Sequence, residues 1–191
     1  MQLKHIAFLT LSAVSTFAMA EGFDVVVVGS GGAGLSSAIT AKESGATVVV
    51  LEKMAYIGGN SNFASGGMNA AGTKQQLAAG VTQDSPELFY KDTMKGGHNL
   101  NNPALLKTLT ENAKYAEEWL VDLGAKFCFR KGRGGGQSIA RGHGPCDGSA
   151  VGPEILRVLT ERAAKDGIAI RTENQVVKIV MKNGAVAGVE V

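Results

Sequence analysis

Residues 23–53 constrain the fold of this chain more than any other segment does. Their sequence is FDVVVVGSGGAGLSSAITAKESGATVVVLEK. The apolar run Val25–Val28 predicts a strand buried on both faces in a parallel sheet. A helical pattern over residues 35–43, which Gly45 can end, leads to a second predicted buried strand over residues 47–51. Strand, helix and strand within about 30 residues predict one βαβ unit of an α/β fold.

The glycines of this segment indicate a bound dinucleotide. Gly29, Gly31 and Gly34 fit G-x-G-x-x-G, in which the first permits a tight turn, the second lets backbone approach a pyrophosphate, and the third allows close helix packing. The helix N-terminus then offers N–H groups to the phosphates. Glu52 ends the second strand, where a carboxylate can accept hydrogen bonds from the ribose hydroxyls. A glycine-rich turn in an unrelated α/β protein would leave Glu52 without a role.

Residues 1–20 have the pattern of a secretory signal peptide. Lys4 precedes an apolar stretch, and Ala18-Met19-Ala20 is a small-x-small cleavage site. The apolar stretch is shorter than the about 20 residues that span a membrane, and no Arg-Arg pair precedes it, which favours Sec-type export. We expect cleavage after Ala20, a periplasmic mature protein without an integral membrane anchor, and one domain over residues 21–191.

Net charge and cysteine content bear on which partners and cofactors the protein binds. The formal net charge of +2 gives no argument for a nucleic-acid partner or an anionic membrane. Cys128 and Cys146 are the only cysteines, and neither belongs to a CxxCH haem motif or a CxxC pair. The sequence therefore predicts no metal site. A disulfide could form after export, and two free thiols fit the sequence at least as well.

A second glycine-rich segment, GGNSNFASGGMNAAG at residues 58–72, follows Glu52 closely. Such a segment can bring backbone N–H groups and short side chains close to a ligand. A flexible surface loop is the alternative. The position after Glu52 favours an ordered pocket wall, as do the apolar residues within it: Phe63, Ala64, Met68 and Ala70.

Two capped helices are predicted next. Ser85-Pro86 begins the first, which runs to about Lys95, and Asn102-Pro103 begins the second, which Gly124 ends. The apolar residues of the second helix that we expect to face the core are Leu105, Leu109, Ala113, Ala116, Leu120 and Leu123. His98 lies in the polar connection between the helices, where we expect a solvated side chain.

Residues 130–152 form a long glycine-rich stretch without a clear element, of the kind that is either functional or disordered. Its basic residues suit a negatively charged ligand, and solvated surface charge explains them equally well. They are Arg130, Lys131, Arg133, Arg141 and His143. A helix over residues 153–166 and a short strand over residues 168–171 follow.

The last residues predict a hairpin. Asn183-Gly184 between two β-rich runs is typical of a type I′ turn. The second strand of this hairpin stops at Val191 without a turn or polar end, which would leave an exposed sheet edge. We therefore expect the N-terminal part of a longer protein, with its fold incomplete at the C-terminus.

In this order, the motifs resemble the flavoprotein of the fumarate reductase and succinate dehydrogenase family. The resemblance rests on residues 29–34, Glu52, GGNSNFASGGMNAAG and GGQSIARGH, and it covers residues 23–191. It is nearest to the soluble exported members, the flavocytochrome c fumarate reductases and the urocanate and methacrylate reductases. It implies a Rossmann-like, glutathione-reductase-type FAD-binding domain in which a β-hairpin is inserted.

The resemblance also implies where FAD binds. Membrane-bound relatives carry a histidine covalently joined to FAD where this chain has Asn60, so non-covalent FAD is expected, and Val176 falls where backbone meets adenine. Motif and resemblance together predict these cofactor-contacting residues: Gly29, Ser30, Gly31, Gly32, Ala33, Gly34, Glu52, Lys53, Gly58, Gly59, Asn60, Ser61, Ser65, Gly66, Gly67 and Val176.

The activity that the resemblance implies is reduction of the C=C bond of a small unsaturated carboxylate by an FAD-dependent oxidoreductase. Relatives place a haem domain ahead of the flavin domain, whereas Phe23 follows the cleavage site almost directly, so a separate c-type cytochrome would supply electrons. The family's substrate-clamping and proton-donating residues fall beyond Val191, and no catalytic residue is assigned. Arg133 and Gly134 stand where some relatives place apolar residues against the substrate, which leaves the particular acid open.

Two other functions remain alternatives. The chain could be a truncated, non-catalytic FAD-binding piece of such an enzyme. A nicotinamide dehydrogenase would fit the first glycine motif but not the second glycine-rich segment.

Overall fold

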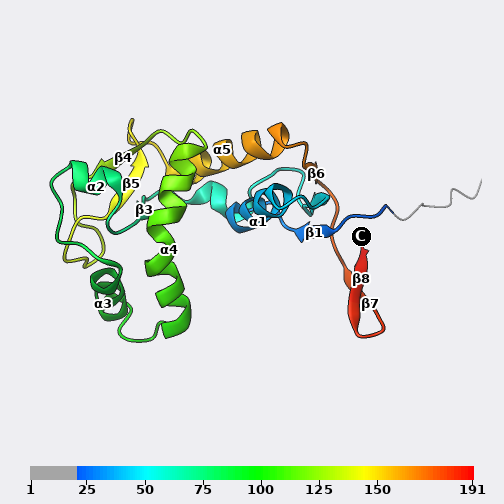
Figure 1. Cartoon of the computed structure of the whole chain (residues 1–191), viewed down its shortest axis with the longest axis horizontal. Helices are drawn as coiled ribbons and strands as arrows, with labels where there is room; N and C mark the ends of the chain where they lie inside the picture. The colour runs from blue at the N-terminus through cyan, green and yellow to red at the C-terminus, as the bar shows by residue number, and fades with distance from the viewer. Residues whose placement is uncertain (1–20) are drawn as a thin grey trace, which may run out of the picture.

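The computed structural model describes residues 21–191 (Figure 1), so the predicted signal peptide and its cleavage site lie outside the described residues. The elements in chain order are β1 (Val25–Val28), α1 (Gly32–Glu43), β2 (Val48–Leu51), the 3₁₀ helix η1 (Gly59–Phe63), β3 (Met68–Asn69), α2 (Lys74–Ala78), α3 (Pro86–Gly96), α4 (Pro103–Asp122), β4 (Phe127–Arg130), β5 (Gly142–Pro145), α5 (Val151–Lys165), β6 (Ala169–Arg171), β7 (Lys178–Lys182) and β8 (Ala185–Glu190).

The predicted βαβ unit is confirmed. Strands β1, β2 and β6 form a parallel sheet in that order, with Val25 opposite Val48 and Val49 opposite Ala169. Helices α1 and α5 pack together on this sheet, and their buried apolar side chains form the main core with it: Val27, Leu35, Ala38, Ile39, Val48, Val50, Leu156, Leu159 and Ala163. The fold is therefore the α/β class that the sequence predicts.

The predicted burial is right for β2 and wrong for β1. All four residues of β2 are buried, because β1 and β6 flank it on both sides. In β1 only Val27 is buried, and the side chain of Val28 is 60% exposed. Within residues 21–191, β1 pairs with β2 alone, so its other edge has no neighbouring strand to cover it.

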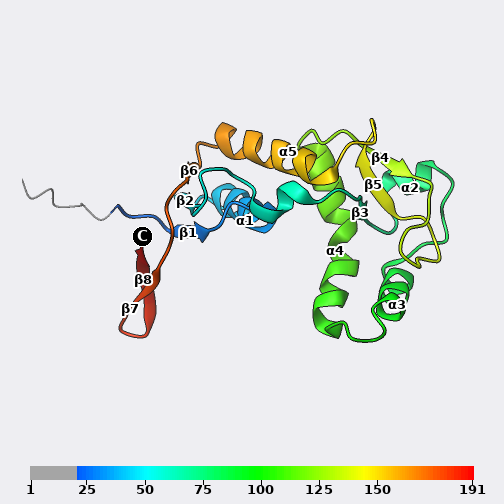
Figure 2. The same cartoon turned by 180° about the vertical axis from the view of Figure 1, so that it is seen from behind.

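A second, antiparallel sheet has the order β3-β5-β4. In both views it lies with α2 and α3 at the end of the molecule opposite the parallel sheet, with α4 and α5 between them (Figures 1 and 2). A small core of Ala70, Ala71, Phe89 and Ala113 joins α3 and α4 to the segment before α2. Residues 130–152, predicted as a loop, are thus partly strand, because β5 pairs with both neighbours. Short α2 was not predicted.

The helix caps are confirmed, and the predicted buried face of α4 is confirmed only in part. Ser85 Oγ accepts a hydrogen bond from Leu88 N at 3.2 Å, and Asn102 Oδ1 accepts one from Ala104 N at 3.0 Å. Leu105 and Leu109, predicted to face the core, are 71% and 54% exposed. Ala113 and Leu120 are buried as predicted, and the other buried residues of α4, which were not predicted, are Leu106, Thr110 and Glu117. Because α4 contacts α3 and α5, the positions of those helices decide which face is buried.

The predicted hairpin is confirmed and stands apart from the rest of the molecule (Figures 1 and 2). Asn183 and Gly184 have φ angles of 53° and 80°, as a type I′ turn requires. A register shift between Val180 and Met181 was not predicted. Among residues 21–191, no helix is both long and apolar enough to cross a membrane.

Candidate functional site

The turn between β1 and α1 can be built only with glycine at two of its positions. Gly29 has a φ of +96°, a conformation that side chains with Cβ rarely adopt. A Cβ on Gly34 would lie 2.0 Å from the carbonyl oxygen of Gly29, so α1 packs directly against the end of β1. At Gly31 the nearest atom to such a Cβ would be Ser61 Oγ at 3.5 Å. Gly29 and Gly34 therefore have the roles that the motif predicts, and the role of Gly31 toward a pyrophosphate stays a prediction.

Glu52 holds this turn from the end of β2. Its Oε2 accepts hydrogen bonds from Ser30 N at 2.9 Å and Ser30 Oγ at 2.7 Å, and its Oε1 accepts one from Met54 N at 2.9 Å. Burial alone would raise the pKa of Glu52, but these hydrogen bonds hold it below its usual value, so the side chain is ionised. A carboxylate has about four acceptor sites. Three are used, which leaves one for a ligand.

Within residues 21–191, the N-terminus of α1 has backbone N–H groups that no other group of the protein accepts. Gly32 N donates to Ser61 Oγ at 3.1 Å and Leu35 N to Gly31 O at 3.0 Å. Among residues 21–191, the N–H groups of Ala33 and Gly34 have no hydrogen-bond partner, and the N-cap residue Gly31 has no side chain to supply one. Unpaired N–H groups and the positive end of the helix dipole together favour an anionic group such as a phosphate.

A cleft of about 700 Å³ opens beside these groups, at the carboxyl ends of β1 and β2. Ligands of open α/β sheets bind in such a crevice. The predicted cofactor residues that line it are Gly29, Gly31, Glu52, Lys53, Gly59, Asn60 and Val176. Ser30, Gly32, Gly58 and Ser61 lie behind it, joined by the hydrogen bonds of the turn, including Gly58 N to Ser30 Oγ at 3.0 Å.

Some predicted residues lie outside this cleft. Ala33 is exposed at the start of α1, and Ser65, Gly66 and Gly67 are exposed on the segment between η1 and β3. The sequence prediction also missed lining residues, namely Val28, Leu51, Met54, Tyr56, Asn174 and Gln175. Asn174 and Gln175 follow the predicted strand over residues 168–171. The rule that ligands bind beyond the carboxyl ends of parallel strands could have identified them.

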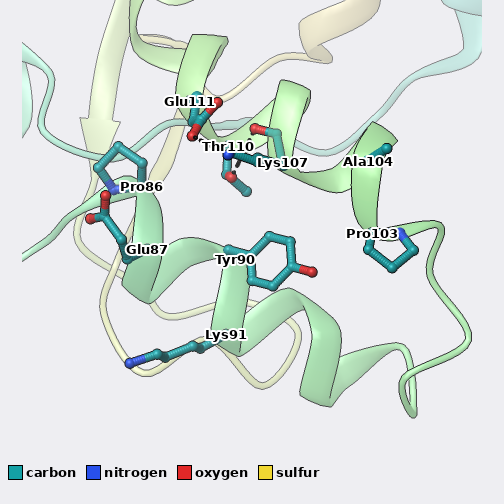
Figure 3. Close-up of a pocket in the computed structure, with 9 residues that line it drawn as sticks. All are labelled: Pro86, Glu87, Tyr90, Lys91, Pro103, Ala104, Lys107, Thr110 and Glu111. Atoms are coloured by element: carbon teal, nitrogen blue, oxygen red, sulfur yellow. Dashed lines mark hydrogen bonds and ion pairs between the residues drawn. The ribbon is translucent and has the colours of Figure 1, made fainter.

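A second hollow, of about 550 Å³, lies between α3 and α4 (Figure 3). Figure 3 shows the ring of Tyr90 on α3 directed toward α4, with Pro86 and Pro103 at the ends of the two helices. None of the predicted cofactor residues lines it. This hollow is therefore separate from the glycine turn.

The hypothesis that Arg141 and His143 bind an anionic ligand is wrong for both residues. The guanidinium of Arg141 is fully buried and pairs with Asp84 and Asp92, each with one N···O distance of 2.6 Å. Its charge is therefore neutralised within the protein. Lys131 and Arg133 are exposed, as the alternative of solvated surface charge predicts.

His143 is a buried structural residue. Its Nε2 lies 2.8 Å from Thr73 Oγ1 and its Nδ1 lies 2.8 Å from the Arg141 carbonyl oxygen. Burial lowers the pKa of His143, so the ring is neutral at pH 7. Thr73 is 70 residues earlier in the chain, so the sequence offered no local signal for this contact.

The two cysteines, left open by the sequence, form a disulfide between Cys128 of β4 and Cys146 just after β5. Within residues 21–191, no three His, Cys, Asp or Glu side chains lie close enough together to bind a metal ion. His98 is exposed in the connection between α3 and α4, as predicted.

The fold and the glycine-turn cleft define an α/β dinucleotide-binding protein. The family model described as "FAD binding domain" matches residues 24–191, and the chain belongs to this family. The residues fit FAD, since α1 leaves N–H groups free for a pyrophosphate and Glu52 keeps one acceptor site.

Comparison with curated relatives shows which members of this family the chain resembles. The chain is 50% identical over 169 residues to the "NADH:fumarate oxidoreductase" of Klebsiella pneumoniae, covering 88% of this chain and 18% of the relative. It is 47% identical over 167 residues to the "Fumarate reductase (cytochrome)" of Shewanella frigidimarina, covering 87% and 29%. It is a fumarate-reductase-like FAD flavoprotein, and it spans less than a third of the length of either relative.

Solved structures support the same assignment of this chain to the FAD-binding family. The open conformation of a flavocytochrome c3 fumarate reductase superimposes with a TM-score of 0.82 at 40% identity, covering 87% of this chain and 29% of the other. A 3-ketosteroid-Δ4-(5α)-dehydrogenase from Rhodococcus jostii gives a TM-score of 0.76 at 27% identity, covering 93% and 43%. The FAD-binding fold is thus shared with enzymes that act on different substrates.

Proposed function

We propose that the whole protein is an FAD-dependent oxidoreductase that reduces the C=C bond of a small, fumarate-like unsaturated carboxylate, with electrons from a separate c-type cytochrome. The observation that carries this proposal is the Gly29–Gly34–Glu52 cleft in a chain 50% and 47% identical to two fumarate reductases. When bound, FAD supplies hydride-transfer chemistry. Relatives named for urocanate and acrylate support the wider class of unsaturated acids.

The residues of the cleft would bind FAD as follows. The free N–H groups at the start of α1 face the pyrophosphate, and the remaining acceptor site of Glu52 binds the adenosine ribose. Val176 lines the same cleft, and its backbone would meet the adenine. Asn60 lines the cleft without a nucleophilic side chain, so FAD stays non-covalent.

A second layer of residues would keep the cleft in shape. Ser61 Oγ fixes Gly32 N, and α5 holds η1 in place, because a Cβ on Gly152 would lie 2.0 Å from the Ser61 carbonyl oxygen. Residues 65–67 are exposed next to η1 and are proposed to contact the cofactor from that side. Residues 21–191 would form the FAD-binding domain, after removal of residues 1–20 on export to the periplasm.

The test is an assay of the full-length protein. It should reduce fumarate or a related unsaturated acid with reduced viologen as donor, and a purified c-type cytochrome should replace the viologen. One relative is named for NADH, so NADH is the informative comparison. Turnover with NADH and none with the cytochrome would contradict the proposed donor. Absence of turnover on every unsaturated acid would favour the alternative of a non-catalytic FAD-binding protein.

A further inference from the structure

The disulfide Cys128–Cys146 lies on the surface of the antiparallel sheet. Cys128 is the second residue of β4 and Cys146 directly follows β5, with their Cα atoms 4.8 Å apart. Both residues are exposed to solvent. A reductant can therefore reach the S–S bond without opening the core.

The chain around this disulfide is closed by other interactions. Strands β4 and β5 pair from Phe127 opposite Pro145 to Arg130 opposite Gly142, and Cys146 N donates to Lys126 O at 3.1 Å. Between the cysteines, the buried ion pairs of Arg141 fix the chain to the segment before α3 and to α3 itself. Breaking the S–S bond would therefore leave the sheet paired.

The charges near the disulfide differ at its two ends. Side chains alternate along a strand, so Cys128 and Arg130 share one side of β4, while buried Phe127 lies on the other. The Arg130 guanidinium lies over Gly144, the residue opposite Cys128, because a Cβ there would be 2.6 Å from Arg130 Nη2. One cation therefore lies beside Cys128, whereas Lys126 lies opposite Cys146, which donates its N–H to the Lys126 carbonyl oxygen.

Acidic side chains also lie near the Cys146 end. Asp147 is the next residue, and hydrogen bonds from Ser149 hold its pKa below the usual value, so it is ionised. Glu154 accepts a hydrogen bond from Lys126 N at 2.8 Å, and Arg157 neutralises Glu154 through an ion pair. A thiolate is stabilised by nearby cations and destabilised by nearby anions. Cys128 is accordingly the better leaving group.

We propose that Cys128–Cys146 is a thiol–disulfide exchange site for a dithiol reductant, and this proposal does not depend on the proposed function. A thiolate of the reductant attacks Cys146 Sγ, a new S–S bond forms, and the Cys128–Cys146 bond breaks with its electron pair on Cys128 Sγ. The second thiol of the reductant loses its proton and attacks its partner sulfur, which releases the Cys146 thiolate. The protein gains two electrons and two protons, and the dithiol becomes a disulfide.

The test treats the folded protein with dithiothreitol, traps free thiols by alkylation, and counts them by mass spectrometry while circular dichroism monitors the fold. Both cysteines should become alkylated with the far-ultraviolet spectrum unchanged. Alkylation that appears only in denaturant, or a spectrum lost on reduction, would overturn the proposal and make the disulfide a structural crosslink.

The direction of attack is tested separately. With the monothiol 2-mercaptoethanol, the adduct trapped by acid should be found on Cys146 by peptide mapping. Arg130→Gln should slow the reduction by about two- to five-fold, because the leaving thiolate loses a cation. Lys165→Gln, an exposed charge change on α5, is the matched control. An adduct on Cys128, or equal rates for the two variants, would contradict the assignment of the leaving group.

Discussion

Replacing Glu117 by glutamine should stabilise the protein at neutral and alkaline pH. Glu117 lies on α4 and is 1% exposed, and its Oε1 accepts a hydrogen bond from Gln75 Nε2 at 3.2 Å. Burial, with a smaller contribution from the neighbouring charge of Glu118 and against the opposing charge of Lys74, raises the pKa of Glu117 from 4.5 to about 7. At pH 8 the chain therefore holds a buried carboxylate with little compensation.

The sign and size of the effect follow from the two pKa values of Glu117. The folded state binds the proton more tightly than the unfolded state, so this contribution to stability is fully present below about pH 4.5 and is lost as pH rises through 7. The pKa of Glu117 is about 2.5 units higher in the folded state than in the unfolded state. At roughly 1.4 kcal/mol per pH unit, this difference corresponds to about 3 kcal/mol of unfolding free energy. Glutamine has no charge to bury, so it avoids this loss.

The assay is urea unfolding at pH 5, 6, 7 and 8, followed by circular dichroism. Relative to the parent, Glu117→Gln should gain about 2.5 kcal/mol between pH 5 and pH 8, because part of the full effect falls below pH 5. Glu111→Gln, a surface acid on the same helix, is the control and should follow the parent curve apart from a small constant offset. A difference between parent and Glu117→Gln that is the same at every pH would refute the reasoning, because it would show an ordinary pKa for Glu117.

Four further predictions concern the cofactor. Gly34→Ala should abolish FAD binding, because the new methyl group would lie 2.0 Å from a backbone carbonyl oxygen. Gly188→Ala is the control, because a methyl group there would have no atom within 4 Å. Equal flavin content in the two variants would contradict the tight packing of α1 against the end of β1. Glu52→Gln should weaken FAD binding by roughly 1 to 3 kcal/mol in a flavin titration, and unchanged affinity would leave Glu52 only its role in the turn. Acid precipitation of the full-length protein should release the flavin, because Asn60 offers no covalent link; a yellow pellet would show otherwise. Residues 21–191 alone should give no reductase turnover with reduced viologen, since no substrate clamp or proton donor is assigned there, and turnover on fumarate, urocanate or methacrylate would disprove this.

The sequence by itself determined the features that depend on local chain geometry. The βαβ unit follows from apolar runs around G-x-G-x-x-G, and the helix starts follow from Ser85 and Asn102, which cap the first turns of α3 and α4. The hairpin follows from Asn183-Gly184, since few other pairs accept two positive φ angles. The caps and the turn are each complete within a few residues, and the βαβ signal within about 30 consecutive residues, so no partner from elsewhere in the chain was needed.

The tertiary structure decided what depends on distant partners. Arg141 reads in sequence as one cation of a basic loop, yet Asp84, 57 residues earlier, neutralises it inside the protein. The buried side of α4 was set by α3 and α5, which turned Leu105 outward and Glu117 inward. The exposure of Val28 depends on how many strands flank β1. Burial and charge pairing are properties of the assembled neighbours, and periodicity within one segment does not specify which neighbours those are.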